Sequence, residues 1–582
     1  MIGTAQAVWD DKRGLTMEHL LYAVVLGLAL AVRVGVFGRW PLRDQEAGLA
    51  LSAWRFARGL PAMLRGHSPL LFHVNALLFF LTDGSDALAR LLSVLFGSSL
   101  VVLPYGLRGY LGRTGALAAS VLLALSPSMV YFSWAVDGSV IVAFCALGLL
   151  VVGADLLESH RPSYAAVATA LLVLALMAGP SVYTLLAILL TFPVALRVSA
   201  RQGADGGGLH DLRHAWCNLA ADADSWRRAL SVAATLFLAA GLGFVYNPMG
   251  LQMALDQFGK WVGDFHFVGT SPWYRAPLLL LLYEGLPLFL GIVGFVVARK
   301  RRDVLTLLLR YWLIFALILS VLPGYRPPSS IVLILLPLVL AAGQAAEYLT
   351  QQIRHMPRRP LFWGLLALSL TVTGAAYVQL ATYLSSPAST YLLRIAALSV
   401  FAVSAYAFVW SLVGPDVPLR AAAVWLLLLL LFGWIRAGVR LNYRRADDVA
   451  EPMVVVSTSP QVLELSGAAA RLSSQVTGDE RTMTWRVDED LEVPLGWYLR
   501  RFERVSYVRE AAEQPDAEAV ILPAGAPAPS EYVGLRFALR SRWVGGRQSL
   551  FEWLRWWTEQ KSAVRGQVVE EAVVLWVKKP PQ

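Results

Sequence analysis

Long apolar stretches limit the fold of this chain more than any other feature. A helix that crosses a bilayer needs about 20 mostly apolar residues. Runs of this kind lie near residues 18–38, 86–108, 115–134, 138–157, 162–179, 181–198, 229–247, 276–298, 304–322, 329–347, 361–383, 391–412 and 419–437. Only 15% of the 582 residues are charged, against about 25% in soluble proteins. The sequence therefore predicts a polytopic α-helical membrane protein with about 13 transmembrane helices, and it excludes a soluble enzyme and a disordered chain.

The distribution of Lys and Arg predicts the orientation in the membrane. The formal net charge is +10, which need not indicate nucleic acid, because cytoplasmic loops of membrane proteins collect positive charge. The basic residues agree on one topology, with the N-terminus in the cytoplasm and the C-terminal segment outside. They include Lys12, Arg113, Arg228, the run Arg299-Lys300-Arg301-Arg302, and Arg358. We expect a multi-pass protein of the plasma membrane without a cleavable signal, since the first apolar run is full length.

The chain divides by composition into two parts. Residues 1–438 read as the transmembrane domain, with a first outer loop at 39–85 and a cytoplasmic loop at 199–228 that contains three consecutive glycines. The run Pro69–Thr82 is too short to span and suits an interfacial helix on the outer leaflet. Residues 439–582 alternate helix and strand patterns and predict a soluble extracytoplasmic α/β domain. Its expected elements are strands at Met453–Ser457, Thr482–Val487, Val505–Val508, Ala519–Leu522 and Val569–Val577, and a helix at Pro460–Ser474.

Three carboxylates follow predicted spans on the outer side. Asp44 and Glu46 begin the helical pattern after the first span, and Asp137 lies between the third and fourth spans. Such acids commonly cap a helix or pair with its dipole. If they meet, they could instead bind a divalent cation such as Mg²⁺ or Mn²⁺, or one of them could act as a general base. The sequence leaves these alternatives open.

Several cationic residues lie on the predicted outer side, although Lys and Arg of membrane proteins are usually concentrated in cytoplasmic loops. Arg275 and Arg326, with Tyr325 beside the second, adjoin predicted spans. They suit either a lipid phosphate, which an arginine fork binds well, or headgroups without specificity. Glu284 falls inside a predicted span and is a functional candidate for that reason, or it pairs with an arginine such as Arg33.

Several stretches together resemble the GT-C membrane glycosyltransferases. The nearer resemblance is to the family called flippase activity-associated proteins, relatives of protein mannosyltransferases and aminoarabinose transferases. The matching stretches are Asp44-x-Glu46-Ala47, His67–Phe79, Ala89-Arg90-Leu91-Leu92, Asp137, Ser271-Pro272-Trp273-Tyr274, Leu282-Tyr283-Glu284, Pro323–Gly343, Val454–Pro460 and Gly496-Trp497-Tyr498-Leu499-Arg500. Each is loose alone, but their order covers nearly the whole chain.

The resemblance implies a GT-C fold and a sugar donor linked to polyprenyl phosphate, used on the outer face. It assigns the catalytic acids to Asp44, Glu46 and Asp137, with a divalent metal as an option, and the donor phosphate to Arg275, Tyr325 and Arg326. His67, His73 and Glu284 are further candidates. The family usually has Asp-Glu side by side, whereas Gln45 precedes Glu46 here. Either Asp44 is the base, or Glu46 acts alone, or catalysis has been lost, because Gln cannot act as a base.

Three functions are compatible with the sequence and with this resemblance. The first is an inverting glycosyltransferase that transfers a sugar to a protein, lipid or glycan. The second is a non-catalytic flippase of lipid-linked sugars or its accessory protein, and the third is a receptor or scaffold. Against transport, we expect no inverted repeat and no pair of matching broken helices. The partners expected are the lipid-linked donor and membrane lipids, with the acceptor unknown and no nucleic acid.

Overall fold

The structure of the chain is a computed structural model. The structure describes residues 16–35, 38–159, 164–201, 222–243, 246–265, 272–301, 303–354, 360–509, 517–529, 531–544 and 567–579. The start of the N-terminus, the glycine-containing part of the loop at 199–228, Ser271, Arg302 and Arg358 lie outside these residues.

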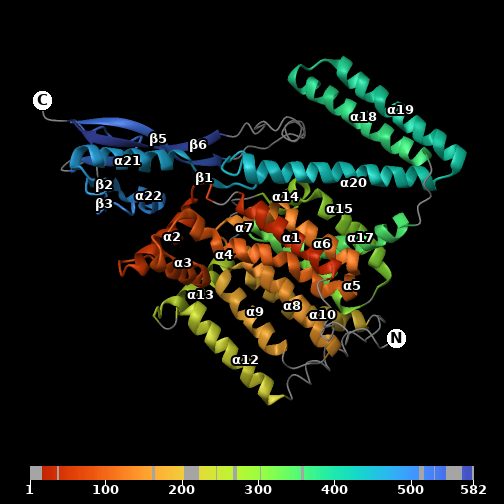
Figure 1. The fold of residues 1–582 in the computed structure, drawn as a ribbon, viewed down its shortest axis with the longest axis horizontal. Coiled ribbons are helices and arrows are strands. Elements are labelled where there is room, and N and C mark those ends of the chain that lie inside the picture. Colours follow the sequence, from red (N-terminus) through yellow and green to blue (C-terminus); the bar gives the residue numbers. More distant parts are fainter. Residues whose placement is uncertain are drawn as a thin grey trace.

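Apolar helices build most of the described chain (Figure 1). Nine of them are long and apolar enough to cross a membrane, and counting each of two bent helix pairs as one span gives eleven. The nine spans are α1 (Met17–Val34), the segment Asp86–Leu111 that starts with α4 (Asp86–Ser99), α8 (Ser139–Ser159), α10 (Ser181–Arg201), α16 (Val304–Val321), α17 (Ile331–Arg354) with the turn before it, α18 (Pro360–Ser385), α19 (Ser389–Val413) and α20 (Asp416–Val439). The polytopic membrane fold is thus confirmed.

The count of thirteen spans is not confirmed. Each predicted run contains helix, but two of them fall short of a span by length or composition. α9 (Tyr164–Ala178) has 15 residues, and α12 (Ala223–Leu236) has 14 and carries several charges. Both are helices in the positions predicted, but length and composition alone do not make them spans.

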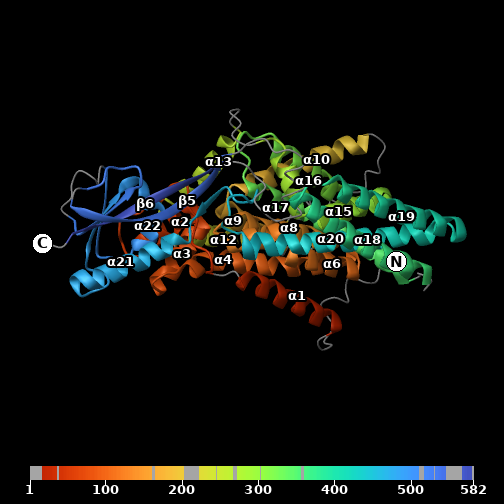
Figure 2. The same ribbon diagram turned by 90° about the horizontal axis from the view of Figure 1, so that it is seen from above.

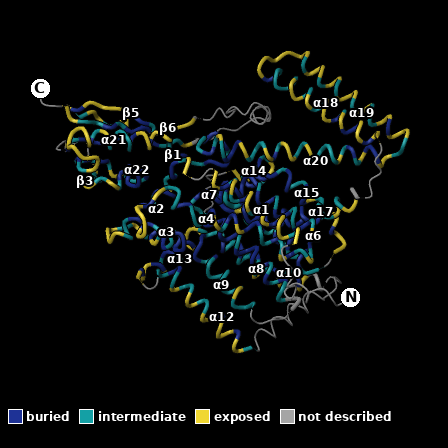
Figure 3. The backbone as a smooth tube through the Cα atoms, viewed as in Figure 1, coloured by how far each residue is buried: buried dark blue, intermediate teal, exposed yellow. Residues whose placement is uncertain are grey.

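Burial separates a packed centre from an exposed hairpin. The helix α17 is the centre of the bundle, with 83% of its span window buried, whereas the figure for α19 is 6%. α18 and α19 form a hairpin that stands away from the bundle beyond α20 (Figure 1), and most of it is exposed or half-buried (Figure 3). Apolar side chains on all sides of such a helix suit a lipid environment.

Glycines allow two helices to approach α17 closely. A Cβ on Gly294 of α15 (Gly285–Val297) would lie 1.8 Å from the carbonyl oxygen of Ala341. Gly115 of α6 (Arg113–Leu125) and Gly343 face each other in the same way, each 2.5–2.7 Å from the other's oxygen if given a Cβ. Small residues at such contacts are the usual way to pack helices in membranes.

Two helix pairs are sharply bent, contrary to the expectation of no matching broken helices. α6 and α7 (Pro127–Trp134) meet at 54°, and α14 (Arg275–Tyr283) and the segment that begins with α15 meet at 99°. Glu284 lies at the second break and accepts hydrogen bonds from Ser126 Oγ (2.6 Å) and the Ser128 N–H (2.9 Å) at the first. The lack of broken helices therefore no longer argues against transport.

The suggested pairing of Glu284 with Arg33 is wrong. The third partner of Glu284 is the indole N–H of Trp434, at 3.1 Å. Arg33 instead donates to the carbonyl oxygens of Leu123 and Ala124, at the end of α6. The last carbonyls of a helix lack partners within it, so a cation there stabilises the break.

The predicted first outer loop forms two helices, α2 (Asp44–Ala57) and α3 (Pro69–Leu81). Ser68 caps α3 by accepting from the Leu71 N–H, and Pro69 occupies the first turn, where its missing N–H costs nothing. Phe72 and Phe79 of α3 are buried, while Phe80 and Leu81 are about 70% exposed. This two-sided burial agrees with a short helix that packs on α2 and presents an apolar face outward.

A six-stranded mixed sheet follows α20, with strand order β1-β5-β6-β4-β2-β3. Its strands are β1 (Val456–Thr458), β2 (Thr484–Asp488), β3 (Arg504–Val508), β4 (Ala519–Pro523), β5 (Tyr532–Val544) and β6 (Gln567–Lys578), and its helices are α21 (Gln461–Thr477) and α22 (Glu492–Leu499). All five predicted strands and the helix occur within a few residues of their expected ends. The sequence missed β5 and α22.

The sheet and the first outer loop share one hydrophobic core. Leu51 and Trp54 of α2 and Phe79 of α3 belong to the same buried cluster as Trp485 and Trp497 of the C-terminal segment. Figure 2 shows α2 and α22 lying together beneath β5. The sheet is therefore anchored on the loop that carries the predicted catalytic acids.

Candidate functional site

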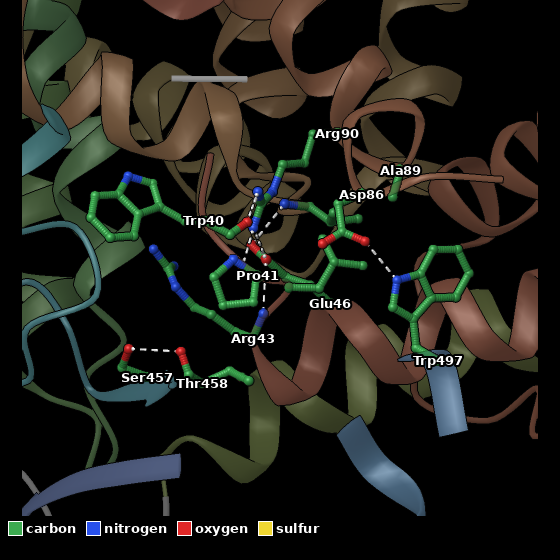
Figure 4. Close-up of polar contacts among 12 residues, drawn as sticks. Trp40, Pro41, Arg43, Glu46, Asp86, Ala89, Arg90, Ser457, Thr458 and Trp497 are labelled. Carbon is green, nitrogen blue, oxygen red and sulfur yellow. Dashed lines mark hydrogen bonds and ion pairs between the residues drawn. The ribbon is translucent and has the colours of Figure 1, made fainter. Parts of the chain in front are cut away.

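Glu46 forms a buried ion pair at the start of α2. One of its oxygens, Oε2, accepts from Arg90 Nη2 at 2.9 Å and from the Arg43 N–H at 3.1 Å (Figure 4). The other, Oε1, accepts from the Val136 N–H at 3.1 Å. The side chains of Glu46 and Arg90 are 6% and 0% exposed.

These contacts suit a positioning role for Glu46. Burial alone would raise the pKa of Glu46, but the charges of Arg90 and Arg43 and their hydrogen bonds outweigh it and lower the pKa. Such a carboxylate is a weak base and has both oxygens engaged. Through Val136 it fixes the second outer loop next to Asp137.

Asp44, two residues before Glu46, has a different environment from that of Glu46. Its Oδ2 accepts from Arg540 Nη1 of β5 at 2.9 Å, and Arg540 also pairs with Glu571 of β6. Its Oδ1 is buried and makes no hydrogen bond to a described residue, although the Thr458 side chain lies near enough to lower the pKa of Asp44. Burial raises the pKa of Asp44, while the hydrogen bond and charge of Arg540 act to lower it. An ionised carboxylate with one free oxygen and a raised pKa can accept a proton from a bound hydroxyl.

Gln45, the departure from the family pattern, differs from both acids in its exposure to solvent. It is exposed, whereas Glu46 is buried and Asp44 half-buried. Successive helical residues lie about 100° apart around the axis, so the three side chains face different surroundings. The amide at this position therefore does not occupy the place of a buried acid.

Asp137 lies on the other side of Glu46, at the start of α8. Its Oδ1 accepts from the Ser139 N–H at 2.8 Å, as the capping alternative predicts. It also lines an open cleft of about 730 Å³ that includes Tyr325 and Arg326. One carboxylate thus both caps a helix and faces a cavity.

The three acids do not gather around a common centre. Among the described residues, no group of three or more His, Cys, Asp or Glu side chains is arranged to hold a metal ion. The engaged oxygens of Glu46 make it a poor ligand. The described residues therefore do not fit the proposed metal, and its requirement stays a prediction.

The two arginines that were predicted to bind the donor phosphate, Arg275 and Arg326, differ in their hydrogen bonds. Arg326 donates to the carbonyl oxygens of Val321 and Gly324 at the end of α16. The guanidinium of Arg275 makes no hydrogen bond or ion pair with the residues that the structure describes, and it interacts electrostatically with Tyr131 and Tyr325. Arg275 is thus the better placed of the two to receive an anion.

Arg43 is a candidate that the sequence analysis missed. Its guanidinium lies 4.6 Å from the ring centre of Tyr131, the same tyrosine that Arg275 approaches, and 5.0 Å from that of Trp134. Its Nη2 is buried without a hydrogen-bond partner among the described residues. Its position in the sequence, between the end of the first span and Asp44, could have identified Arg43 as a candidate.

The two histidines have structural environments. His73 Nδ1 lies 3.1 Å from the Ala240 oxygen, and Nε2 lies 3.1 Å from Asn247 Nδ2. The ring therefore joins α3 to residues that follow α12 in the sequence. His67 stacks on Phe72, and its Nε2 is buried without a partner among the described residues. Burial lowers the pKa of His67, with Lys260 adding to the effect. Neither ring lines the cleft.

A second buried ion pair, which was not predicted from the sequence, lies just after α20 and contacts the bundle through Tyr283. Arg440 pairs with Glu451, and Glu451 Oε2 accepts from Tyr283 Oη at 2.7 Å. Both ionic side chains are at most 6% exposed. This contact fixes the chain where it leaves the last apolar helix.

Comparison with known proteins supports the fold. No family model matches the sequence, and no curated protein matches it. The structure of ArnT from Cupriavidus metallidurans bound to undecaprenyl phosphate is similar at a TM-score of 0.53 and 16% identity, covering 95% of this chain and 97% of that one. Its apo state gives 0.53 and 15%, over the same shares of both chains. An oligosaccharyltransferase from Archaeoglobus fulgidus is more distant, at 0.45 and 12%, covering 88% of this chain and 70% of that one. The chain therefore shares the fold of the ArnT structure, a bundle of apolar helices followed by a C-terminal sheet.

Proposed function

We propose that this protein is a membrane glycosyltransferase that moves a sugar from a polyprenyl-phosphate-linked donor to an acceptor on the outer face. The observation that supports this most is a likeness over nearly the whole chain to a structure that holds undecaprenyl phosphate. The acids, the arginines and the cleft of the site all lie where outer loops meet the bundle. A hexosyl or mannosyl specificity is part of the proposal, and the acceptor stays open.

The reaction needs one base and a stabilised leaving group. The acceptor oxygen attacks the anomeric carbon as the bond from that carbon to the phosphate oxygen breaks. The phosphate leaves with the electron pair of that bond, and the configuration inverts. The acceptor proton passes to Asp44, whose Oδ1 is the unpartnered carboxylate oxygen. A phosphate monoester is a good leaving group, so positioning the acceptor is the larger task.

Arg43 and Arg275 are the cations best placed for the leaving phosphate. Both approach Tyr131, and each retains unused hydrogen-bonding capacity among the described residues. Arginine binds phosphate through two parallel N–H bonds, and fixed cations stabilise charge that develops on a leaving group. With the predicted orientation, both face the outer leaflet, where the lipid-linked donor would be bound.

The alternative is a non-catalytic flippase or its accessory protein. The two bent helix pairs that meet at Glu284 favour it, because broken helices are frequent in transporters. Movement of a labelled polyprenyl-phosphate sugar across proteoliposomes, without chemical transfer, would establish this alternative.

Transfer from a panel of labelled polyprenyl-phosphate sugars tests the proposal. Wild-type protein would be compared with Asp44→Asn, Glu46→Gln and Asp137→Asn, each with Mg²⁺, with Mn²⁺ and with a chelator. Asp83→Asn is the matched control, since Asp83 is an outer-loop acid in exposed ion pairs. We expect Asp44→Asn to lose about a hundredfold in rate, the scale of a general base, and the control to lose little. Turnover that survives Asp44→Asn would contradict the assignment of the base.

A further inference from the structure

The open cleft beside Asp137 has a wall that the proposed reaction does not use. The starts of α8 and α10, the end of α13 (Gly250–Gly263) and the turn before α17 surround it. Its volume of about 730 Å³ includes space open to solvent. Its lining contains both charged and aromatic side chains, the two kinds of surface that the edges and faces of a polar ring would contact.

Three seryl hydroxyls around the cleft are without partners. Ser139, Ser181 and Ser330 line it, and the Oγ of each is buried with no hydrogen bond to a described residue. Ser139 is only 4% exposed. A buried hydroxyl without a partner destabilises a protein, and three around one cavity indicate that a ligand completes their hydrogen bonds.

The charges of the cleft favour a ligand that donates hydrogen bonds. Asp137 and Asp264 both line it and interact with Tyr325, whereas Arg275, which also interacts with Tyr325, is not part of the lining. Asp264 joins the same turn through its carbonyl oxygen, which accepts from the Tyr325 N–H at 3.0 Å. Two carboxylates repel a phosphate, and the Arg326 guanidinium donates to the carbonyl oxygens of Val321 and Gly324. Carboxylates and hydroxyls together suit the hydroxyl groups of a neutral ring.

An aromatic side chain adds an apolar surface. Trp261 lines the cleft, and its indole N–H donates to Thr184 Oγ1 at 3.0 Å, which holds the ring in place. Binding sites of small molecules usually combine such apolar surface with a few fixed polar groups. This combination matches a sugar, which has apolar faces and polar edges.

We propose that this cleft binds the neutral, polyhydroxylated sugar ring of the donor and does not bind its phosphate. The proposal rests on the proposed function, and it moves Tyr325 and Arg326 from the phosphate to the sugar. Ser139, Ser181 and Asp264 become specificity-determining residues. They were not recognised from the sequence because they lie in three separate segments.

The test measures binding of a bare lipid phosphate and of its sugar-bearing forms by the full chain in nanodiscs. The probes are undecaprenyl phosphate and the same lipid carrying mannose, glucose or galactose. The variants are Ser139→Ala and Asp264→Asn, with Ser181→Ala as a substitute if Ser139→Ala does not fold. Ser93→Ala is the matched control, because Ser93 Oγ is likewise buried and unpartnered but lies in α4, away from the cleft.

The relevant probe is the sugar-bearing lipid with the highest affinity for wild type. We expect its binding to be about three- to tenfold weaker in Ser139→Ala and about ten- to a hundredfold weaker in Asp264→Asn. Binding of the bare lipid phosphate should not change, and Ser93→Ala should change neither. Equal weakening for both lipids would overturn the proposal, as would unchanged binding in both variants or a wild type that prefers no sugar.

Parallel transfer assays separate the two proposals. Sugar-selective binding that depends on Ser139 and Asp264, without any transfer, would overturn the enzyme and retain the cleft. Transfer that proceeds normally in variants with unchanged sugar binding would overturn the cleft and retain the enzyme.

Discussion

Asp44 at the start of α2 and Arg540 in β5 are 496 positions apart in the sequence, and their Oδ2 and Nη1 atoms are 2.9 Å apart. The contact brings the C-terminal sheet to the acid that we propose as the base. Arg540 is itself held by Glu571 on the neighbouring strand. The sheet is thus a part of the candidate site, and its removal would leave Asp44 without its cation.

We predict that Arg540→Gln slows transfer and moves the acidic limb of its pH profile upward. The charge and hydrogen bond of Arg540 lower the pKa of Asp44 against the effect of burial. Without them the pKa rises further, so the base is protonated at a higher pH and activity is lost earlier as the pH falls. The measurement is kcat/KM against pH. Arg536→Gln, an exposed arginine on the same strand, is the control. An unshifted limb in Arg540→Gln would show that Arg540 does not tune the base.

The pair of Glu46 and Arg90 should act mainly on stability. Removal of one partner leaves a buried charge, which costs about 3–5 kcal/mol. We therefore expect Glu46→Gln or Arg90→Met to lower the thermal unfolding midpoint strongly, and the double variant to lose less than the sum of both. The exposed pair of Arg58 and Asp83 is the control, with a loss of about 1 kcal/mol or less. Additive losses at Glu46 and Arg90 would argue against a coupled pair.

Replacement of Gln45 should have little effect. Because its side chain is exposed and separate from Asp44 and Glu46, Gln45→Ala and Gln45→Asp should both stay within about threefold of the wild-type rate, the effect of about half a kcal/mol usual for surface positions. The assay is the donor transfer assay. A large gain in Gln45→Asp would mean that the chain has lost an acid that its ancestors used.

The sequence predicted the elements better than their contacts. Each apolar run became helix because a bilayer imposes a single requirement on length and hydropathy. The bends at Ser126 and Glu284 were missed, since hydropathy remains high across them. β5 was missed because the strand mixes glycine, arginine and apolar residues, and its pairing with β6 supplies what its own pattern lacks.

The site could be predicted only in part for a related reason. Asp44, Glu46 and Asp137 were found because they follow spans, but the sequence could not separate a base from an ion pair. That distinction depends on Arg90 and Arg540, which come from other elements. The hydroxyls of Ser139 and Ser181 carry no local signal at all. They are recognised only when folding leaves them buried and unpartnered around one cleft.

Glu284 provides the last prediction, because it joins the two helix breaks. Its carboxylate accepts from Ser126, Ser128 and Trp434. Leucine at this position would leave three buried donors unsatisfied, at about 1–3 kcal/mol each, whereas glutamine retains one accepting oxygen. We expect Glu284→Leu to lower the thermal unfolding midpoint far more than Glu284→Gln. Ser369→Ala, which removes a buried hydroxyl of the outlying α18, is the control.

The same pair of variants distinguishes a structural from a transport role for Glu284. If it only holds the breaks together, Glu284→Gln should transfer sugar nearly as wild type does. If it takes up a proton during movement of a lipid, Glu284→Gln should be nearly as stable as wild type and yet inactive, because the amide keeps the hydrogen bonds that its one oxygen accepts but cannot titrate. Since the hydrogen bonds from Ser126 Oγ and the Ser128 N–H already account for its burial, we expect the first result.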